Sequence, residues 1–150
     1  MIADDQLERV SPRAKAIAVW FEAMSANSLA LLDQVYAHDA RFCDPFNEVK
    51  GLGAIAAIYG HMFENLTVPR FVITEIIEQD QRIFMAWRFL FQWRGQSFDI
   101  PGGTRFWLDG NGLVVDHQDY WDVAQGLYEK LPVLGWLLKR LRQRMATPIQ

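Results

Sequence analysis

The chain has 150 residues, the length of a single domain that can bury a sizeable core. Its composition, 51% hydrophobic and 22% charged, is that of a globular protein and excludes a disordered one. The formal net charge of -3 gives no general attraction to nucleic acid or to a membrane. The only cysteine, Cys43, excludes an internal disulfide and a cysteine-based metal cluster.

The N-terminus carries acidic residues where a secretory signal would carry basic ones, and no apolar run follows. No stretch approaches the roughly 18 consecutive apolar residues of a membrane-spanning helix. Because a single cysteine also suits a reducing compartment, we expect a cytoplasmic protein. No repeat, low-complexity segment or linker divides the sequence, so residues 1–150 are predicted to form one domain.

Helical patterns come first along the chain. Ser11 and Pro12 form a helix start signal, since Ser caps a helix N-terminus and Pro suits the first helical position. The helix that follows is predicted over residues 13–24, with its apolar side chains on one stripe at helical spacing. We also predict a short helix over 29–36, a short strand over 40–44 and a longer helix over about 54–65.

From Pro69 onward the hydrophobic period changes to two, which is typical of strands. Four long strands are predicted, over residues 71–78, 82–93, 97–108 and 113–122. The run Pro101-Gly102-Gly103 is expected to make a bulge or bend in the third. Helices followed by an antiparallel meander indicate an α+β domain. We expect a strongly bent sheet that wraps around the helices and leaves a conical pocket.

Strand alternation predicts which side chains face that pocket. In the last strand the odd-numbered positions, from Leu113 and Val115 onward, form the more apolar set and should face inward. In the strand over 82–93, the odd positions form an almost wholly apolar, aromatic face. The polar and aromatic residues expected to share the inner faces are Phe42, Asp44, Trp87, Phe89, Thr104, Phe106, His117, Asp119 and Trp121.

Two motifs stand out: Tyr36-Ala37-His38-Asp39-Ala40-Arg41-Phe42-Cys43-Asp44-Pro45, followed by Gly51 and Ala54-Ile55, and later His117-Gln118-Asp119-Tyr120-Trp121-Asp122. Together they resemble the nuclear transport factor 2-like superfamily, which includes ketosteroid isomerases, limonene-epoxide hydrolases and SnoaL-like polyketide cyclases. The similarity runs from about Ala14 to Asp122, in the expected order. It implies a cone-shaped, curved antiparallel or mixed sheet around the N-terminal helices and, as in many relatives, a homodimer.

The resemblance also implies site positions. Asp44 matches the carboxylate that serves ketosteroid isomerases as general base, and that family's oxyanion-hole positions hold Trp20 and Thr104. Asp119 matches an Asp of the epoxide hydrolases, although aromatic residues replace the Arg and second Asp of their water-activating set. SnoaL-like cyclases combine an Asp with His residues in a similar pocket, and this chain departs from them least.

The predicted catalytic residues are therefore Asp44, His117 and Asp119. A carboxylate beside aromatic rings loses hydration, which strengthens it as a base for removing a proton next to a carbonyl. Our hypothesis is that Asp44 or Asp119 moves the proton while His117 and Trp20 orient and polarise a hydrophobic carbonyl compound. The remaining predicted ligand contacts are Phe42, Trp87, Phe89, Thr104, Phe106 and Trp121.

Structural roles are the alternative for these residues. Asp44 before Pro45 can cap a turn, and His117 and Asp119 can simply bond each other or the backbone. Two functions stay open: an isomerase or cyclase working by acid–base chemistry, and a non-catalytic module that binds an apolar ligand or a protein. We expect no metal, cofactor or nucleic-acid partner, because the sequence has no metal-ligand spacing, phosphate loop or dinucleotide fingerprint.

The chain continues beyond the length of the compact isomerases, with a break at Pro132. Such a segment, with an apolar stripe and a basic cluster, can lie on an anionic membrane, close the mouth of the cone or mediate a dimer contact. We favour the lid or packing role, without membrane binding. The stripe is Leu134, Leu137, Leu138, Leu141 and Met145, and the cluster is Lys139, Arg140, Arg142 and Arg144.

Overall fold

The structure is a computed structural model that describes residues 2, 4–130 and 132–146. In these residues the strands are β1 (Tyr36–Cys43), β2 (Glu48–Lys50), β3 (Thr67–Gln79), β4 (Arg82–Trp93), β5 (Gln96–Leu108) and β6 (Val114–Trp121). The helices are α1 (Asp4–Leu7), α2 (Pro12–Glu22), α3 (Leu52–Asn65), α4 (Val123–Gly126) and α5 (Pro132–Met145), with 3-10 helices η1 (Ala26–Gln34) and η2 (Tyr128–Lys130).

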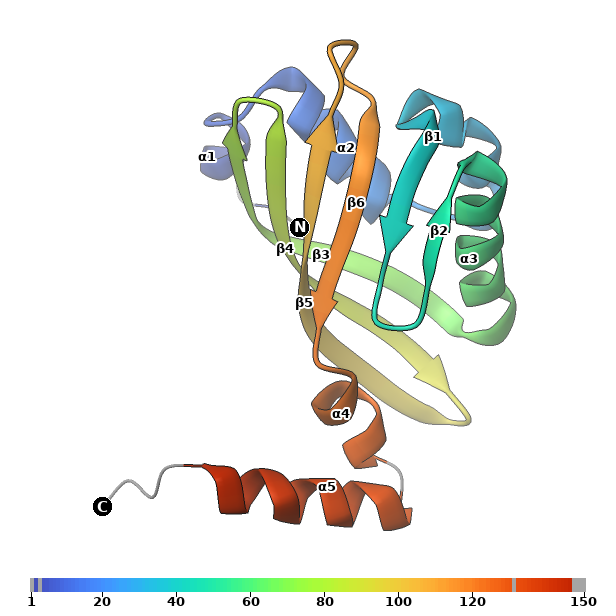
Figure 1. Cartoon of the computed structure of the whole chain (residues 1–150), viewed down its shortest axis with the longest axis vertical. Helices are drawn as coiled ribbons and strands as arrows, with labels where there is room; N and C mark the ends of the chain where they lie inside the picture. Colours follow the sequence, from blue (N-terminus) through green and yellow to red (C-terminus); the bar gives the residue numbers. More distant parts are fainter. Residues whose placement is uncertain (1, 3, 131, 147–150) are drawn as a thin grey trace.

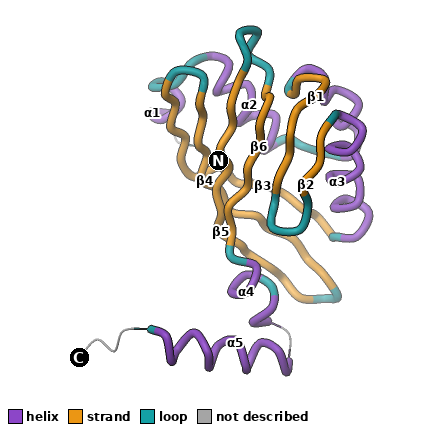
Figure 2. Tube along the Cα trace, in the orientation of Figure 1, coloured by secondary structure: helices purple, strands orange, loops and turns teal. Residues whose placement is uncertain are grey.

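The strands form a single curved sheet in the order β2-β1-β6-β5-β4-β3, and α2, η1 and α3 lie against it (Figures 1 and 2). β1 runs parallel to β6, whereas every other pair of neighbouring strands is antiparallel. The predicted α+β class with a mixed, curved sheet is therefore confirmed. The short strand β2 was not predicted, because three residues are too few to show a period of two.

The start of α2 follows the predicted signal. The Ser11 side chain accepts a hydrogen bond from the Ala14 amide at 3.1 Å, and Pro12 takes the first helical turn. The Ser11 amide and hydroxyl also donate to the Glu78 carboxylate of β3, at 2.6 and 2.7 Å. The cap therefore begins the helix and also fastens it to the sheet, with Ile17 and Phe21 buried in the core.

The predicted second helix is wrong in type and in bounds. Residues 26–34 form the 3-10 helix η1, and Leu31 within it has non-helical backbone angles. Tyr36 belongs to β1, where it pairs with Val114 of β6. The reason is tertiary, since this pairing with β6 gives the backbone a ladder that a further helical turn would exclude.

Of the bulge or bend predicted at Pro101-Gly102-Gly103, the bulge is wrong, because the register between β4 and β5 is uninterrupted through this run. The two glycines instead make room for aromatic rings. A Cβ atom at Gly102 would lie 2.3 Å from the Trp87 ring, and one at Gly103 would lie 2.5 Å from the Phe84 ring. Because Gly102 and Gly103 have no side chains, the rings of Trp87 and Phe84 on β4 can lie across β5, one on each face of the sheet.

A bulge does occur in β6, where Trp107 pairs with Asp116 but Leu108 pairs with Val114. The extra residue, Val115, changes which side chains point inward. Val114 is fully buried, whereas Leu113 and Val115 are only half-buried, so the predicted alternation fails at this end of the strand. It is confirmed beyond the bulge, where His117 is buried and Tyr120 is exposed.

We predict that Gly102→Ala destabilises the protein by about 1–3 kcal/mol, because the new methyl group overlaps the Trp87 ring. Urea unfolding followed by tryptophan fluorescence measures the difference. Gly110→Ala is the matched control, since a Cβ atom at Gly110 has no atom within 4 Å. Equal free energies of unfolding for the two variants would contradict the close approach of Trp87 to Gly102.

Candidate functional site

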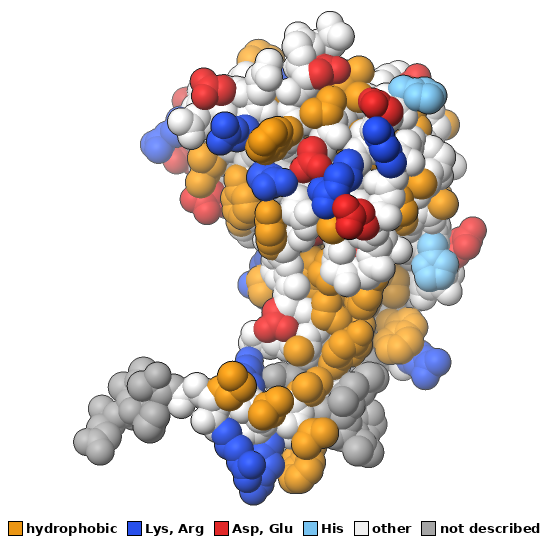
Figure 3. Space-filling model, in the orientation of Figure 1, with side chains coloured by type: hydrophobic (Ala, Val, Ile, Leu, Met, Phe, Trp, Pro, Cys, Tyr) orange, Lys and Arg blue, Asp and Glu red, His pale blue; other side chains and the backbone are white. Residues whose placement is uncertain are grey.

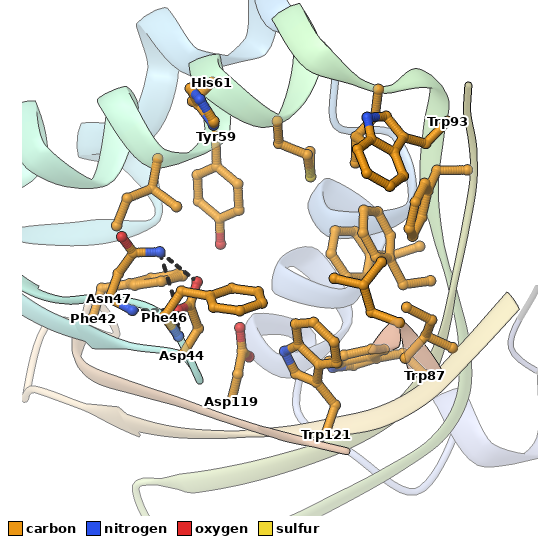
Figure 4. Close-up of a pocket in the computed structure, with 18 residues that line it drawn as sticks. Phe42, Asp44, Phe46, Asn47, Tyr59, His61, Trp87, Trp93, Asp119 and Trp121 are labelled. Atoms are coloured by element: carbon orange, nitrogen blue, oxygen red, sulfur yellow. Dashed lines mark hydrogen bonds between the residues drawn. The ribbon is translucent and has the colours of Figure 1, made fainter. Parts of the chain in front are cut away.

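A cavity of about 280 Å³ lies between the concave face of the sheet and α3 (Figure 4). Its volume is close to the lower end of the range of small-molecule sites. Aromatic rings supply most of its wall, among them Phe42, Phe71, Phe89, Trp93 and Trp121. The polar side chains along it are Asp44, Asn47, Tyr59, His61 and Asp119. A mainly apolar wall with a few polar groups favours binding of a molecule that is largely hydrophobic.

A second, smaller cavity of about 20 Å³ adjoins the first at its inner end, and Tyr59, Trp87 and Asp119 line both. Thr104, Phe106 and His117 line only the smaller one. Its volume suits about one water molecule, and its wall offers polar partners. Asp119 and Tyr59 therefore lie at the boundary between the apolar cavity and a buried polar region.

A chain of hydrogen bonds runs through this polar region, and Asp119 is at its centre. The Trp87 indole N–H donates to Thr104 Oγ1 at 2.8 Å, and the Thr104 hydroxyl donates to Asp119 Oδ1 at 2.5 Å. His117 Nε2 lies 2.8 Å from the same carboxylate oxygen. In the described part of the chain, both bonds to Asp119 use Oδ1, so Oδ2 is left for the cavity.

The chain of hydrogen bonds continues from His117 to two tyrosines. The Tyr36 hydroxyl lies 2.8 Å from His117 Nδ1 and 3.0 Å from the Tyr59 hydroxyl. Both imidazole nitrogens are thus hydrogen-bonded, although His117 is only 1% exposed. We call the connected side chains of Trp87, Thr104, Asp119, His117, Tyr36 and Tyr59 the Asp119 chain.

The phenols of the Asp119 chain stay protonated. Burial is the largest cause that raises the pKa of Tyr36 and of Tyr59 well above the ordinary value, and the charge of Asp119 adds to it. For Tyr59 the neighbouring Tyr36 and the Asp44 carboxylate act in the same direction. Both tyrosines are therefore hydrogen-bond donors at neutral pH and not bases.

Asp44 lines the cavity but is held by its own turn. Its Oδ1 accepts the amide hydrogens of Phe46 and Asn47, at 2.7 and 2.6 Å, and the Asn47 side-chain amide lies 3.1 Å from both carboxylate oxygens (Figure 4). This is the turn-capping geometry that Asp before Pro favours. Asp44 therefore combines the two readings that the sequence left open, a turn cap and a carboxylate at the cavity wall.

The structure brings most of the sequence-predicted site residues together. Trp20 is the exception, because it lines neither cavity, and its ring lies edge-on to Tyr36 and Tyr59. Its indole nitrogen is buried without an acceptor among the described residues. The geometry thus gives no support for Trp20 as a ligand contact. Phe42, Asp44, Trp87, Phe89, Asp119 and Trp121 line the larger cavity, and Thr104, Phe106 and His117 the smaller one.

Sequence reasoning missed Tyr36 and Tyr59 as site residues. A buried tyrosine needs a partner for its hydroxyl, so a Tyr at an inward position is a signal that could have found them. For Tyr59 that position is one helical turn after Ile55 on α3, and both side chains are buried. No group of three or more His, Cys, Asp or Glu side chains that could hold a metal ion occurs in the part of the chain that the structure describes.

The curved mixed sheet with its cavity defines the class, a nuclear transport factor 2-like domain with a cone-shaped fold. Within that class the chain belongs to the SnoaL-like domain family, which matches residues 17–117. The family assignment that the sequence motifs suggested is thereby confirmed. No curated protein matches the chain in sequence.

Solved structures share the fold at low sequence identity. An NTF2-like protein of unknown function from Burkholderia pseudomallei K96243 has a TM-score of 0.69 at 20% identity, over 77% of this chain and 95% of its own. A proposed SnoaL-like polyketide cyclase from Jannaschia sp. CCS1 has a TM-score of 0.66 at 17% identity, and the match covers 77% of this chain and 92% of the cyclase. A LEH-like epoxide hydrolase from M. tuberculosis has a TM-score of 0.66 at 14% identity, and the match covers 87% of this chain and 96% of the hydrolase.

We predict that Tyr36→Phe destabilises the protein by about 1–3 kcal/mol, because the hydroxyl bonds both His117 and Tyr59 in a buried site. The control is Tyr120→Phe, which removes a hydroxyl from a side chain that is 50% exposed and should cost less than about 0.5 kcal/mol. Urea unfolding of both variants measures the difference. Similar values for the two would contradict a structural role for the Asp119 chain.

The raised pKa of Tyr36 and of Tyr59 predicts a loss of stability in alkali. The folded protein holds both phenols neutral, so their contribution is complete below pH about 10 and declines as the pH rises above that value. The free energy of unfolding should therefore fall more steeply above pH about 10 in the wild type than in a Tyr36→Phe/Tyr59→Phe variant. Parallel pH profiles would count against this, since all other titrating groups are common to both proteins.

Proposed function

We propose that the protein binds a small, mainly hydrophobic carbonyl compound and moves a proton next to the carbonyl, with Asp119 as the base. The observation that carries this proposal is the position of Asp119 at the boundary of the two cavities. One carboxylate oxygen is held by Thr104 and His117, and the other is available to a ligand. A base fixed in this way keeps its orientation without losing its free oxygen.

Tyr59 is the proposed hydrogen-bond donor to the substrate oxygen. Its hydroxyl points into the cavity from α3 (Figure 4). Its pKa is raised by burial, so it donates as a neutral phenol. A donor at this point stabilises the negative charge that develops on a carbonyl oxygen when the neighbouring carbon loses a proton.

The proton transfer can be written with these two groups. Asp119 Oδ2 takes the proton from the carbon, the C–H electron pair forms a C=C bond, and the C=O pair moves to the oxygen facing Tyr59. In the Asp119 chain His117 Nε2–H donates to Asp119 Oδ1, so Nδ1 accepts the hydrogen of the Tyr36 hydroxyl, and the Tyr59 hydroxyl can donate to Tyr36 or turn to the substrate oxygen. Return of the proton from Asp119 to another carbon of a conjugated enolate completes an isomerisation. Attack of the enolate on a second carbonyl instead forms the C–C bond of a ring, and the alkoxide that results takes the proton back from Asp119.

The lining of the larger cavity supports the substrate class. Aromatic rings form most of its wall, and Asp119 and Tyr59 lie at its inner end, where the smaller cavity adjoins it. A molecule that places a carbonyl at that end and an apolar body toward Phe89 and Trp93 satisfies both regions. The names of the structural neighbours, a cyclase and an epoxide hydrolase among them, agree with a fold that hosts small-molecule chemistry.

Deuterium exchange tests the proposal without knowledge of the natural substrate. We expect the wild-type protein in heavy water to accelerate the exchange of the acidic C–H of α-tetralone, an apolar cyclic ketone, as followed by proton NMR. Asp119→Asn should lower the rate by a factor of about 100 or more, because the base is removed while the shape is kept. Asp122→Asn is the matched control, since Asn also caps α4 and the residue does not line the cavity.

A second candidate, apolar-ligand binding without catalysis, is favoured by the geometry of Asp44. With that carboxylate bonded to its own turn, Asp119 is the proposed site's one carboxylate with an oxygen free for a ligand. Fluorescence binding of β-naphthol, whose hydroxyl resembles an enol, distinguishes the two. Binding that is weakened by Tyr59→Phe, together with no exchange of α-tetralone, would assign the pocket to binding alone. Exchange that Asp119→Asn leaves unchanged would overturn the catalytic proposal.

A further inference from the structure

Helix α5 contributes no described side chain to the wall of either cavity. It lies beyond the end of the sheet, next to α4 and η2 (Figure 1). Of the lid or packing role favoured from the sequence, the described residues show packing of α5 against η2 and α4, whereas the side chains of Leu137, Leu141 and Met145 face solvent. Leu137 is 55% exposed, Leu141 54% and Met145 80%.

These three side chains form one stripe. They are spaced at intervals of four residues, which places them on the same face of a helix. Leu138, next to the stripe, is half-buried, and the side chain of Leu134 lies outside the described residues. Exposed apolar residues scattered singly are ordinary on protein surfaces, but a continuous stripe along a helix marks an interaction face.

The charges on α5 indicate what kind of partner fits that face. The helix carries Lys139, Arg140, Arg142 and Arg144 and has no acidic residue in its sequence. Trp136 is exposed, and the Arg140 guanidinium lies 5.7 Å from the centre of its ring. In Figure 3 Lys and Arg side chains gather on the helix beside hydrophobic ones. The complementary surface is therefore apolar and negatively charged.

We propose that α5 is a surface anchor that lies flat on a membrane rich in anionic lipids. In this arrangement Leu137, Leu141 and Met145 enter the boundary between headgroups and acyl chains, and Arg140 and Arg144, which flank the stripe, extend to the phosphates. At about 1.5 Å per residue the helix is shorter than the roughly 30 Å hydrocarbon core, and no helix of the described residues is long and apolar enough to span it.

The charge pattern favours lipid over a second copy of the chain on this face. Two α5 helices packed stripe to stripe would bring two sets of cations together, and like charges across a contact are destabilising. Anionic headgroups instead neutralise each cation. A dimer through α5 is the competing outcome of the test.

Vesicle co-sedimentation tests the anchor with the full chain. We expect binding to vesicles of equal parts phosphatidylcholine and phosphatidylglycerol, and little binding to phosphatidylcholine alone. Binding should fall sharply between about 0.1 M and about 1 M salt, because the Debye length shortens from about 10 to about 3 Å. Arg140→Gln with Arg144→Gln should weaken the binding by about fivefold for each charge removed, because both side chains flank the stripe.

Leu141→Glu is the decisive variant, and it should weaken binding to the anionic vesicles by at least about tenfold. Ile77→Glu is the matched control, because Ile77 of β3 is 53% exposed and lies away from α5. Both positions are exposed, so both variants should keep the melting temperature of the wild type, which circular dichroism checks.

Three results would overturn the anchor. The first is equal binding to neutral and anionic vesicles, and the second is equal binding by Leu141→Glu and Ile77→Glu. The third is sedimentation equilibrium showing a dimer that Leu141→Glu dissociates, with no vesicle binding by the wild type. That last result would assign the stripe to a second copy of the chain.

Discussion

The hydrogen bonds that Thr104 and His117 make to Asp119 Oδ1 are the interaction on which the site depends. A carboxylate at the inner end of an aromatic cavity is costly unless its oxygens have partners. Thr104 of β5 supplies one partner, and His117 of β6 supplies the other. His117 also extends the network to Tyr36 of β1 and, through it, to Tyr59 of α3. The same bonds therefore compensate the buried charge, orient the base and connect the helix to the sheet.

The shape of the cavity depends on the positions where glycine leaves space for an aromatic ring. Gly102 lets the Trp87 ring lie across β5, and the Trp87 indole can then reach the Thr104 hydroxyl. Beyond this point the wall is formed by rings that contact one another, such as Phe71 and Phe89, with centres 4.6 Å apart. The result is a cavity with Asp119 and Tyr59 at the end shared with the smaller cavity and aromatic rings beyond it, which orients a ligand with one polar group.

Much of this arrangement was predictable from the alternation of residues along strands. His117, Asp119 and Trp121 occupy alternate positions of β6, and their shared inward face follows from the pleat. The prediction failed at Val114 because a bulge is specified by the pairing of two strands and leaves no mark in the periodicity of one. Tyr59 was missed for a similar reason, since its partner Tyr36 is distant in sequence and only the packing of α3 on β1 joins them.

By itself, the sequence determined the order of the long helices and strands, the α+β class, the inward residues of β6 beyond its bulge and the amphipathic pattern of α5, because each is a property of neighbouring residues. The tertiary structure decided which of those residues meet. It placed Trp20 outside both cavities, bonded Asp44 into its turn, linked Asp119 to Tyr59 through His117 and Tyr36, and left the stripe of α5 uncovered. Such outcomes depend on long-range contacts, and no local pattern specifies whether an apolar stripe finds a partner within its own chain.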